Sequence, residues 1–192
     1  MIDAGDTAAI LLAAGQSLRF GTDDKLLAPL GGEPLALHAA RRIVELAPRR
    51  RIAVCREADG TLARQLAGLG FEIVANPHTD RGLSQSLSYG IAAAACGLEA
   101  AALVCLADMP FVSIGHLQSL LSRFDPSDAP AVASTNGEAA MPPVLFGRSL
   151  FDRLQAARGD RGGRGLLTGA ALVAADAGEL ADIDQPEDFR RY

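Results

Sequence analysis

Seven short runs of apolar residues recur along the chain, and each has the length of a buried strand. Between most of these runs the apolar residues return every three or four positions, which is typical of an amphipathic helix. Continuous apolar strands that alternate with helices indicate an α/β fold, with a mostly parallel sheet covered by helices on both faces. The expected strands are 8–14, 51–55, 71–75, 101–107, 129–133, 143–146 and 172–175, and the expected helices are 35–46, 60–69, 84–96, 114–124 and 150–157.

The length of 192 residues suits a single domain over residues 1–192, without a long linker, repeat or low-complexity tract. No apolar run reaches the ~18–20 residues of a membrane span, and the polar, acidic residues 1–6 are unlike a signal peptide. The net charge of −5 argues against a nucleic-acid partner. Cys55, Cys96 and Cys105 form no C-x-x-C pair, which predicts reduced, buried thiols and a cytoplasmic protein.

The first apolar run stops at a cationic loop that contains Gly15, Ser17, Arg19 and Gly21 and leads to Lys25. Successive backbone N–H groups in such a loop form a nest that binds anions. A loop of this kind at the carboxyl end of a strand suits a polyphosphate. The glycine spacing fits neither the Walker pattern nor the dinucleotide pattern, and an ordinary strand-to-helix turn is the alternative.

Carboxylates stand at two further places where this fold binds ligands. Asp108 follows an apolar strand and precedes Pro110, which predicts a Mg²⁺ ligand at the mouth of the crevice. A turn or capping role is the alternative, and Ser113 is expected to cap the helix that follows. Asp182 and Asp184 have period-two spacing, so an extended segment would place both on one face. Their alternative is capping of a terminal helix.

The segment L-x-A-G-x-S-x-R-F-G over residues 12–21, with Lys25 four residues on, resembles the signature of the molybdenum cofactor nucleotidyltransferases, the MobA-like branch of the nucleotidyltransferase superfamily. Further segments resemble motifs of that family in the expected order. Ala107, Met141 and Gln185 depart from the usual Gly, Gly and Thr. These segments are 76–87 (N-x-x-x-x-x-G-[ML]-x-x-S-L), 107–110 (G-D-M-P), 141–146 (G-x-P-[AV]-L-F), 159–164 (G-D-x-G-A-R) and 182–189 (D-[IV]-D-T-P-E-D-L).

The resemblance implies a Rossmann-like nucleotidyltransferase that transfers a nucleotidyl group from an NTP to a phosphorylated acceptor and releases pyrophosphate. It implies Mg²⁺ held by Asp108 and Asp184, with Asp182 as the fallback for the second ligand. Arg19 and Lys25 would stabilise the charge that moves onto pyrophosphate, so the implied catalytic residues are Arg19, Lys25 and Asp108.

The resemblance also implies two sets of binding residues. Ser84 is expected to cap its helix, Ser86 suits either a ligand contact or the helix start, and Asp160 suits either an acceptor contact or a cap. The nucleotide set is Leu12, Ala13, Ala14, Gly15, Ser17, Arg19, Lys25, Asn76, Gly82 and Ser86, and the acceptor set is Pro143, Asp160 and Arg164.

The tetrapeptide of residues 12–15, L-A-A-G, tends to accompany CTP in this family, whereas L-A-G-G tends to accompany GTP. The expected reaction is therefore transfer of CMP from CTP to molybdopterin, with a molybdoenzyme or its chaperone as the protein partner. The alternatives are a nucleotidyltransferase that uses GTP or another small phosphorylated acceptor, and a non-catalytic protein that binds and delivers a nucleotide or cofactor.

Overall fold

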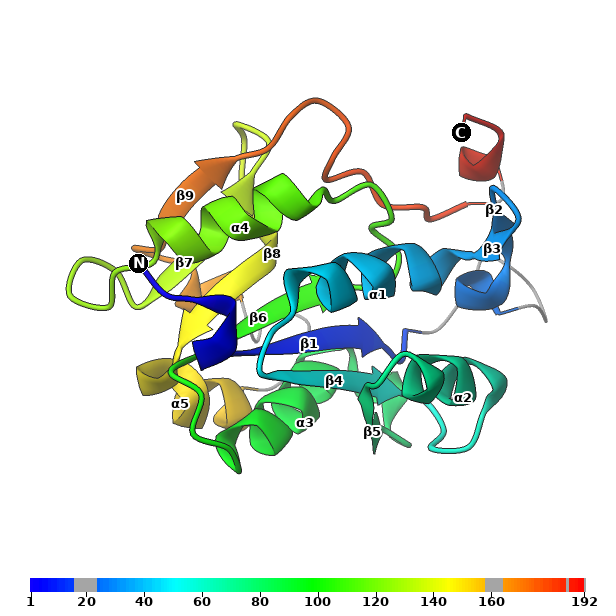
Figure 1. Cartoon of the computed structure of the whole chain (residues 1–192), viewed down its shortest axis with the longest axis horizontal. Helices are drawn as coiled ribbons and strands as arrows, with labels where there is room; N and C mark the ends of the chain where they lie inside the picture. Colours follow the sequence, from blue (N-terminus) through cyan, green and yellow to red (C-terminus); the bar gives the residue numbers. More distant parts are fainter. Residues whose placement is uncertain (16–23, 158–163, 186, 192) are drawn as a thin grey trace.

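The computed structural model describes residues 1–15, 24–157, 164–185 and 187–191 (Figure 1). Within this part of the chain, seven strands form the central sheet in the order β5-β4-β1-β6-β8-β7-β9. The strands are β1 (Thr7–Ala13), β4 (Arg50–Cys55), β5 (Glu72–Ala75), β6 (Ala101–Leu106), β7 (Ala131–Thr135), β8 (Ala140–Gly147) and β9 (Ala171–Ala174).

Helices cover both faces of this sheet, which confirms the three-layer α/β fold. Figure 1 shows α1 and α4 on one side of the strands and α3 and α5 on the other. The buried side chains of β1 alternate accordingly: Leu11 packs with the cluster of α1, α2 and α4, and Ile10 packs with that of α3 and α5. The helices are α1 (Leu35–Leu46), α2 (Thr61–Gly68), α3 (Leu83–Ala95), α4 (Ile114–Arg123) and α5 (Phe151–Ala156).

One strand of the sheet, β8, runs antiparallel to its two neighbours. β1 pairs in parallel with β4 and β6, whereas β8 is antiparallel to both β6 and β7. Val104 near the end of β6 is paired with Val144, so the beginning of β8 lies beside the end of β6. The β7–β8 hairpin therefore reaches the edge at which β1 and β6 end.

The remaining elements are short; one of them was not predicted, and one prediction about a cysteine is wrong. The hairpin of β2 (Pro29–Leu30) and β3 (Glu33–Pro34) was not expected, because two-residue strands leave no periodicity to detect. Cys55 and Cys105 are buried as expected, but Cys96 is exposed because it follows the last turn of α3. The 3-10 helices are η1 (Ala4–Asp6), η3 (Lys25–Leu27), η4 (Thr79–Arg81), η5 (Arg148–Leu150), η6 (Arg164–Leu166) and η7 (Asp188–Arg191).

Among the described helices, none is long and apolar enough to cross a membrane.

Helix α3 approaches the sheet closely at Gly90. A Cβ atom added there would lie 2.6 Å from the Cγ2 atom of Ile10 and 3.1 Å from the Cγ2 atom of Val54. Real Cβ atoms essentially never come within 3.0 Å of such a neighbour. Gly90 therefore sets the distance between α3 and the sheet, and α3 carries residues of the site described below. Gly68, the last residue of α2, has nothing within 4 Å of the corresponding position.

We expect Gly90→Ala to lower the free energy of unfolding by ~1–3 kcal/mol, because the added methyl overpacks the helix–sheet contact. Gly68→Ala is the matched control, since it makes the same change in open space and should raise stability by up to ~1 kcal/mol through better helix propensity. Urea unfolding of both variants measures the difference. Equal stability of the two variants would contradict the close contact at Gly90.

Candidate active site

Two cavities open next to each other at the edge where β1 and β6 end. The smaller, of about 440 Å³, contains most of the described residues predicted to bind the nucleotide and the metal. We call it the nucleotide cavity. The predicted residues that line it are Leu12, Ala14, Gly15, Lys25, Gly82, Ser86, Asp108 and Asp184.

The other predicted residues fall elsewhere. Ala13, Asn76 and Pro143 are buried and are not among the described residues that line either cavity. Ala13 packs with the cluster on the opposite face of the sheet from Ala14, because neighbouring residues of a strand point to opposite faces. Ser17, Arg19 and Asp160 lie outside the described residues, as does the side chain of Arg164.

Lys25 joins the two predicted metal ligands. Its Nζ donates hydrogen bonds to Oδ2 of Asp108 at 2.8 Å and to Oδ1 of Asp184 at 3.1 Å. The three side chains come from η3, from the turn after β6 and from the C-terminal segment, so three distant parts of the chain meet at one ammonium. Its positive charge reduces the repulsion between the carboxylates.

The Lys25 side chain is only 12% exposed, and burial alone would lower its pKa. The charges of Asp108 and Asp184 outweigh that effect and raise the pKa. Lys25 is therefore a fixed positive charge over the whole physiological pH range.

The backbone holds Asp184 beside Asp108. The Ile183 N–H donates to the carbonyl oxygen of Asp108 at 2.9 Å, which ties the C-terminal segment to the end of β6. The Oδ2 atom of Asp188 accepts from the N–H groups of Asp184 and Gln185 at 3.0 and 2.9 Å. Asp188 is thus a capping carboxylate, whereas the carboxylate of Asp184 points to Lys25.

Asp182 lies on the larger cavity rather than on the nucleotide cavity. Burial and then the nearby charge of Asp184 raise the pKa of Asp182. Asp182 therefore lines a different cavity from Asp184, although it is only two positions away in the sequence.

The loop after β5 is built around Asn76, which is fully buried. Its Nδ2 donates to Oγ of Ser86 at 2.9 Å, and its Oδ1 accepts from the His78 N–H at 2.9 Å. Asn76 thus orients Ser86, which lines the nucleotide cavity. Gly82 ends the loop with a φ of +79°, a conformation that favours glycine.

The predicted caps of two helices have opposite outcomes. Ser113 caps α4, and its side chain accepts from the His116 N–H at 3.1 Å, as expected. The capping role of Ser84 is wrong, because α3 begins at Leu83 and Gly82 occupies the N-cap position. Ser84 is instead buried in the first turn, where it lines the larger cavity.

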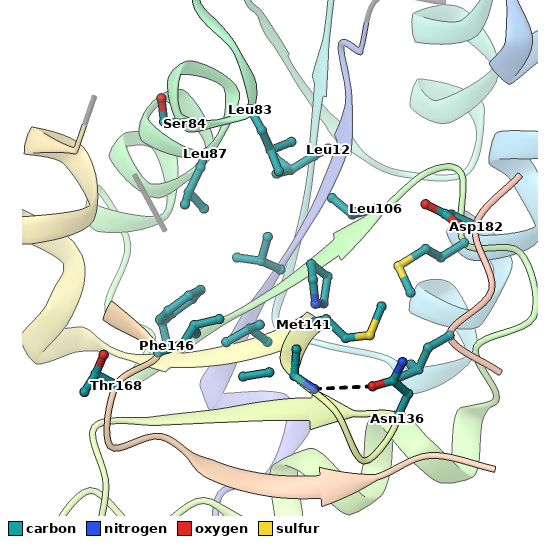
Figure 2. A pocket seen from close by; sticks show the side chains of 18 residues that line it. Leu12, Leu83, Ser84, Leu87, Leu106, Asn136, Met141, Phe146, Thr168 and Asp182 are labelled. Atoms are coloured by element: carbon teal, nitrogen blue, oxygen red, sulfur yellow. Dashed lines mark hydrogen bonds between the residues drawn. The ribbon is translucent and has the colours of Figure 1, made fainter. Parts of the chain in front are cut away.

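The sequence analysis assigned Pro143 to the acceptor, and residues beside it line a larger cavity of about 750 Å³, which the sequence analysis did not predict (Figure 2). It lies over β6 and β8 and is closed by the start of α3 and the β7–β8 hairpin. Apolar side chains scattered along the sequence give no motif, but the Asn136-Gly137 pair is a hairpin signal that could have drawn attention to this loop. Residues on it include Leu83, Leu106, Met109, Asn136, Met141, Phe146, Leu167, Thr168 and Leu180.

A model of the MobA-like NTP transferase domain matches residues 9–176. The chain belongs to the MobA-like NTP transferase family. It is therefore a nucleotidyltransferase, as the resemblance of its motifs implied. The matched region includes Lys25 and Asp108 and ends before Asp184.

Curated proteins related to this MobA-like transferase have several names. The purine catabolism protein PucB of Bacillus subtilis is 32% identical over 197 residues, covering 94% of this chain and 92% of PucB. The bifunctional protein GlmU of Sphingopyxis alaskensis is 33% identical over 146 residues, and the match spans 76% of this chain but only 32% of GlmU. The molybdenum cofactor guanylyltransferase of Shewanella putrefaciens is 28% identical over 149 residues, covering 77% of this chain and 73% of that enzyme.

Solved structures share the fold. A nucleotidyl transferase from Methanothermobacter superposes with a TM-score of 0.79 at 24% identity, covering 96% of this chain and 94% of the other. The order of the strands and the helices on both faces are therefore those of a known nucleotidyltransferase architecture.

Proposed function

We propose that this MobA-like transferase moves CMP from CTP to molybdopterin and releases pyrophosphate. The observation that carries the reaction type is the pair of carboxylates, Asp108 and Asp184, that share the Lys25 ammonium in the nucleotide cavity. The relative named molybdenum cofactor guanylyltransferase supports molybdopterin as the acceptor. The L-A-A-G sequence of residues 12–15 supports CTP as the donor.

The two carboxylates suit a divalent cation. Both direct an oxygen at one positively charged atom, and Mg²⁺ prefers one or two carboxylates together with phosphate oxygens and water. Asp108 and Asp184 would hold the ion, which supplies screening of charge between the α-phosphate and the acceptor phosphate when bound. A structural neighbour from Mycobacterium tuberculosis was solved with manganese, at 20% identity and a TM-score of 0.76.

The residues of the chain have positional and electrostatic tasks in this reaction. The nucleophile is the acceptor phosphate, which is largely ionised near neutral pH because its second pKa is about 6. No side chain has to remove a proton from it. Lys25 would stabilise the charge that develops on pyrophosphate, and the Gly15 loop and Ser86 would hold the nucleotide in line for the attack.

GTP is the second candidate donor, because the relative from Shewanella putrefaciens is named as a guanylyltransferase. The test of the proposed function is incubation of the purified protein with Mg²⁺, molybdopterin and each of the four NTPs. The expected result is pyrophosphate release with CTP, and a product whose mass exceeds that of molybdopterin by one cytidylyl group. CTP binding without pyrophosphate release from any NTP would instead identify a delivery protein.

We expect Lys25→Ala to weaken CTP binding by about tenfold or more, because it removes a charged hydrogen-bond donor and leaves two carboxylates unneutralised. The loss should be larger for CTP than for CMP if Lys25 contacts the β- and γ-phosphates. Lys25→Arg is the control that keeps the charge. Calorimetric titration with both nucleotides measures the effect, and equal losses for CTP and CMP would contradict the contact with the outer phosphates.

A further inference from the structure

A third carboxylate lines the nucleotide cavity, and the reaction described above gives it no task. Asp80 and its neighbour Thr79 belong to η4 and stand on the wall of this cavity together with Gly82 and Ser86. Asp80 is exposed, and among the described residues none donates a hydrogen bond to its carboxylate or forms an ion pair with it. Both of its acceptor oxygens are therefore available to a molecule in the cavity.

The turn that carries Asp80 is fixed by hydrogen bonds. The Oδ1 atom of Asn76 accepts from the His78 N–H at 2.9 Å, and the Arg81 N–H donates to the carbonyl oxygen of His78 at 3.1 Å. Gly82 follows and leads directly into α3. The backbone of Asp80 thus has a defined position on the wall, which a side chain needs if it is to recognise one particular group of a ligand.

The charges of the cavity distinguish its two ends. Lys25 neutralises Asp108 and Asp184 beside the end of β6, and this end suits the phosphates. The loop that carries Asp80 follows β5, and the strand order places β4 and β1 between β5 and β6 (Figure 1). A carboxylate without a neutralising cation would repel the phosphates of a nucleotide. Asp80 therefore suits the uncharged nucleoside end of the ligand.

The nucleoside offers a carboxylate two kinds of hydrogen-bond donor. The ribose hydroxyl groups are the same in all four NTPs, so a contact with them gives no choice of base. The amino group at position 4 of cytosine is a donor, and aspartate accepts from this group in nucleic-acid recognition. Uracil has a carbonyl oxygen at the same position, which would face the carboxylate as a second acceptor.

We propose that Asp80 is a specificity-determining residue, which accepts a hydrogen bond from the amino group of cytosine and thereby excludes UTP. The inference rests on the proposed function, because it assumes that CTP occupies the nucleotide cavity with its phosphates towards Lys25. Guanine carries an amino group as well, so Asp80 separates CTP from UTP and leaves the choice between CTP and GTP to other residues.

The test is calorimetric titration of the whole chain with CTP and with UTP, in the presence of Mg²⁺ and without an acceptor. The two nucleotides have the same charge, the same sugar and rings of the same size, so their difference reports the edge of the base. We expect the wild-type protein to bind CTP about tenfold more tightly than UTP, or more, because one well-placed hydrogen bond to a base discriminates on this scale.

Asp80→Asn should remove this preference. The amide has the same shape as the carboxylate, but it can donate to the carbonyl oxygen of uracil and accepts more weakly from cytosine. We expect the variant to bind CTP a few fold more weakly and UTP a few fold more tightly, which brings the ratio of the two affinities to within about threefold. A gain in the binding of UTP is a result that damage to the fold would not produce.

Asp152→Asn is the matched control, because it removes the same charge from another exposed aspartate. Asp152 lies in the first turn of α5, which follows β8, and Gly147 at the end of β8 is paired with Ala101 at the beginning of β6. The control therefore changes the opposite edge of the sheet. It should leave both affinities and their ratio unchanged.

Equal affinities of the wild-type protein for CTP and UTP would overturn the proposal. An equal loss for both nucleotides in the Asp80→Asn protein would also overturn it, since that result indicates a contact with the ribose. Failure of the proposed function has a different signature. In that case the preference for CTP over UTP would still depend on Asp80, but CTP and molybdopterin would release no pyrophosphate.

Discussion

Replacement of Asp108 by asparagine is expected to lower the turnover of nucleotidyl transfer at least ~10²-fold while leaving the fold intact. The side chain follows β6 and is 26% exposed, so the substitution neither buries a new polar group nor opens a space in the core. Asparagine has the same shape but lacks the negative charge that Lys25 and a divalent cation require. The loss should therefore appear in turnover and not in stability.

Asp184→Asn should have a similar effect, because Asp184 shares the Lys25 ammonium with Asp108. Asp182→Asn is the matched comparison: it makes the same chemical change two residues away, on the other cavity, and should have a smaller effect. Steady-state pyrophosphate release gives the turnover, and urea unfolding verifies the fold. Normal turnover of the Asp108→Asn protein would refute its assignment as a metal ligand.

The base preference is the second large effect that we expect. The wild-type protein should use CTP more efficiently than GTP by roughly one to two powers of ten in kcat/KM, which is the range that a methyl-scale contact can supply. Ala14 lies directly after β1 and lines the nucleotide cavity with Gly15. We expect its methyl group to reduce the space beside the base, and cytosine is the smaller ring.

Ala14→Gly should reduce the preference for CTP, mainly by admitting GTP. Ala13→Gly offers a matched control, because the structure directs the Ala13 side chain to the opposite face of the sheet. Both variants remove one buried methyl group from the same part of the chain, so a loss of stability should be similar in both. The measurement is kcat/KM for CTP and GTP with the same acceptor, and a wild-type preference for GTP would contradict the cytidylyl assignment.

Periodicity predicted the elements well where it is strong. The helix over residues 35–46 has the predicted bounds, and the strand predicted over 51–55 begins one residue earlier in β4. It could not give the direction of β8, since alternation along a strand is the same in either direction. Ser84 looked like a cap because serine favours that position, but the positive φ of Gly82 ends the loop earlier and moves the helix start to Leu83.

The site, too, combines features that the sequence predicted with features that it could not predict. The sequence placed Asp108 and Lys25 near a bound polyphosphate, because both follow the carboxyl ends of parallel strands. It did not predict their direct hydrogen bond, which joins residues 83 positions apart and depends on the path of the chain into η3. Nor could it separate Asp182 from Asp184, because that requires the tie between the Ile183 N–H and Asp108.

The antiparallel direction of β8 has a consequence for how this protein could diversify. The larger cavity takes one wall from the β7–β8 hairpin, a connection of adjacent strands, whereas the nucleotide cavity is built from β1, β6, the start of α3 and the C-terminal segment. Residues 136–142 line none of the nucleotide cavity. Exchanging that hairpin between homologues should therefore leave the choice of nucleotide with the recipient, whatever it changes in the larger cavity.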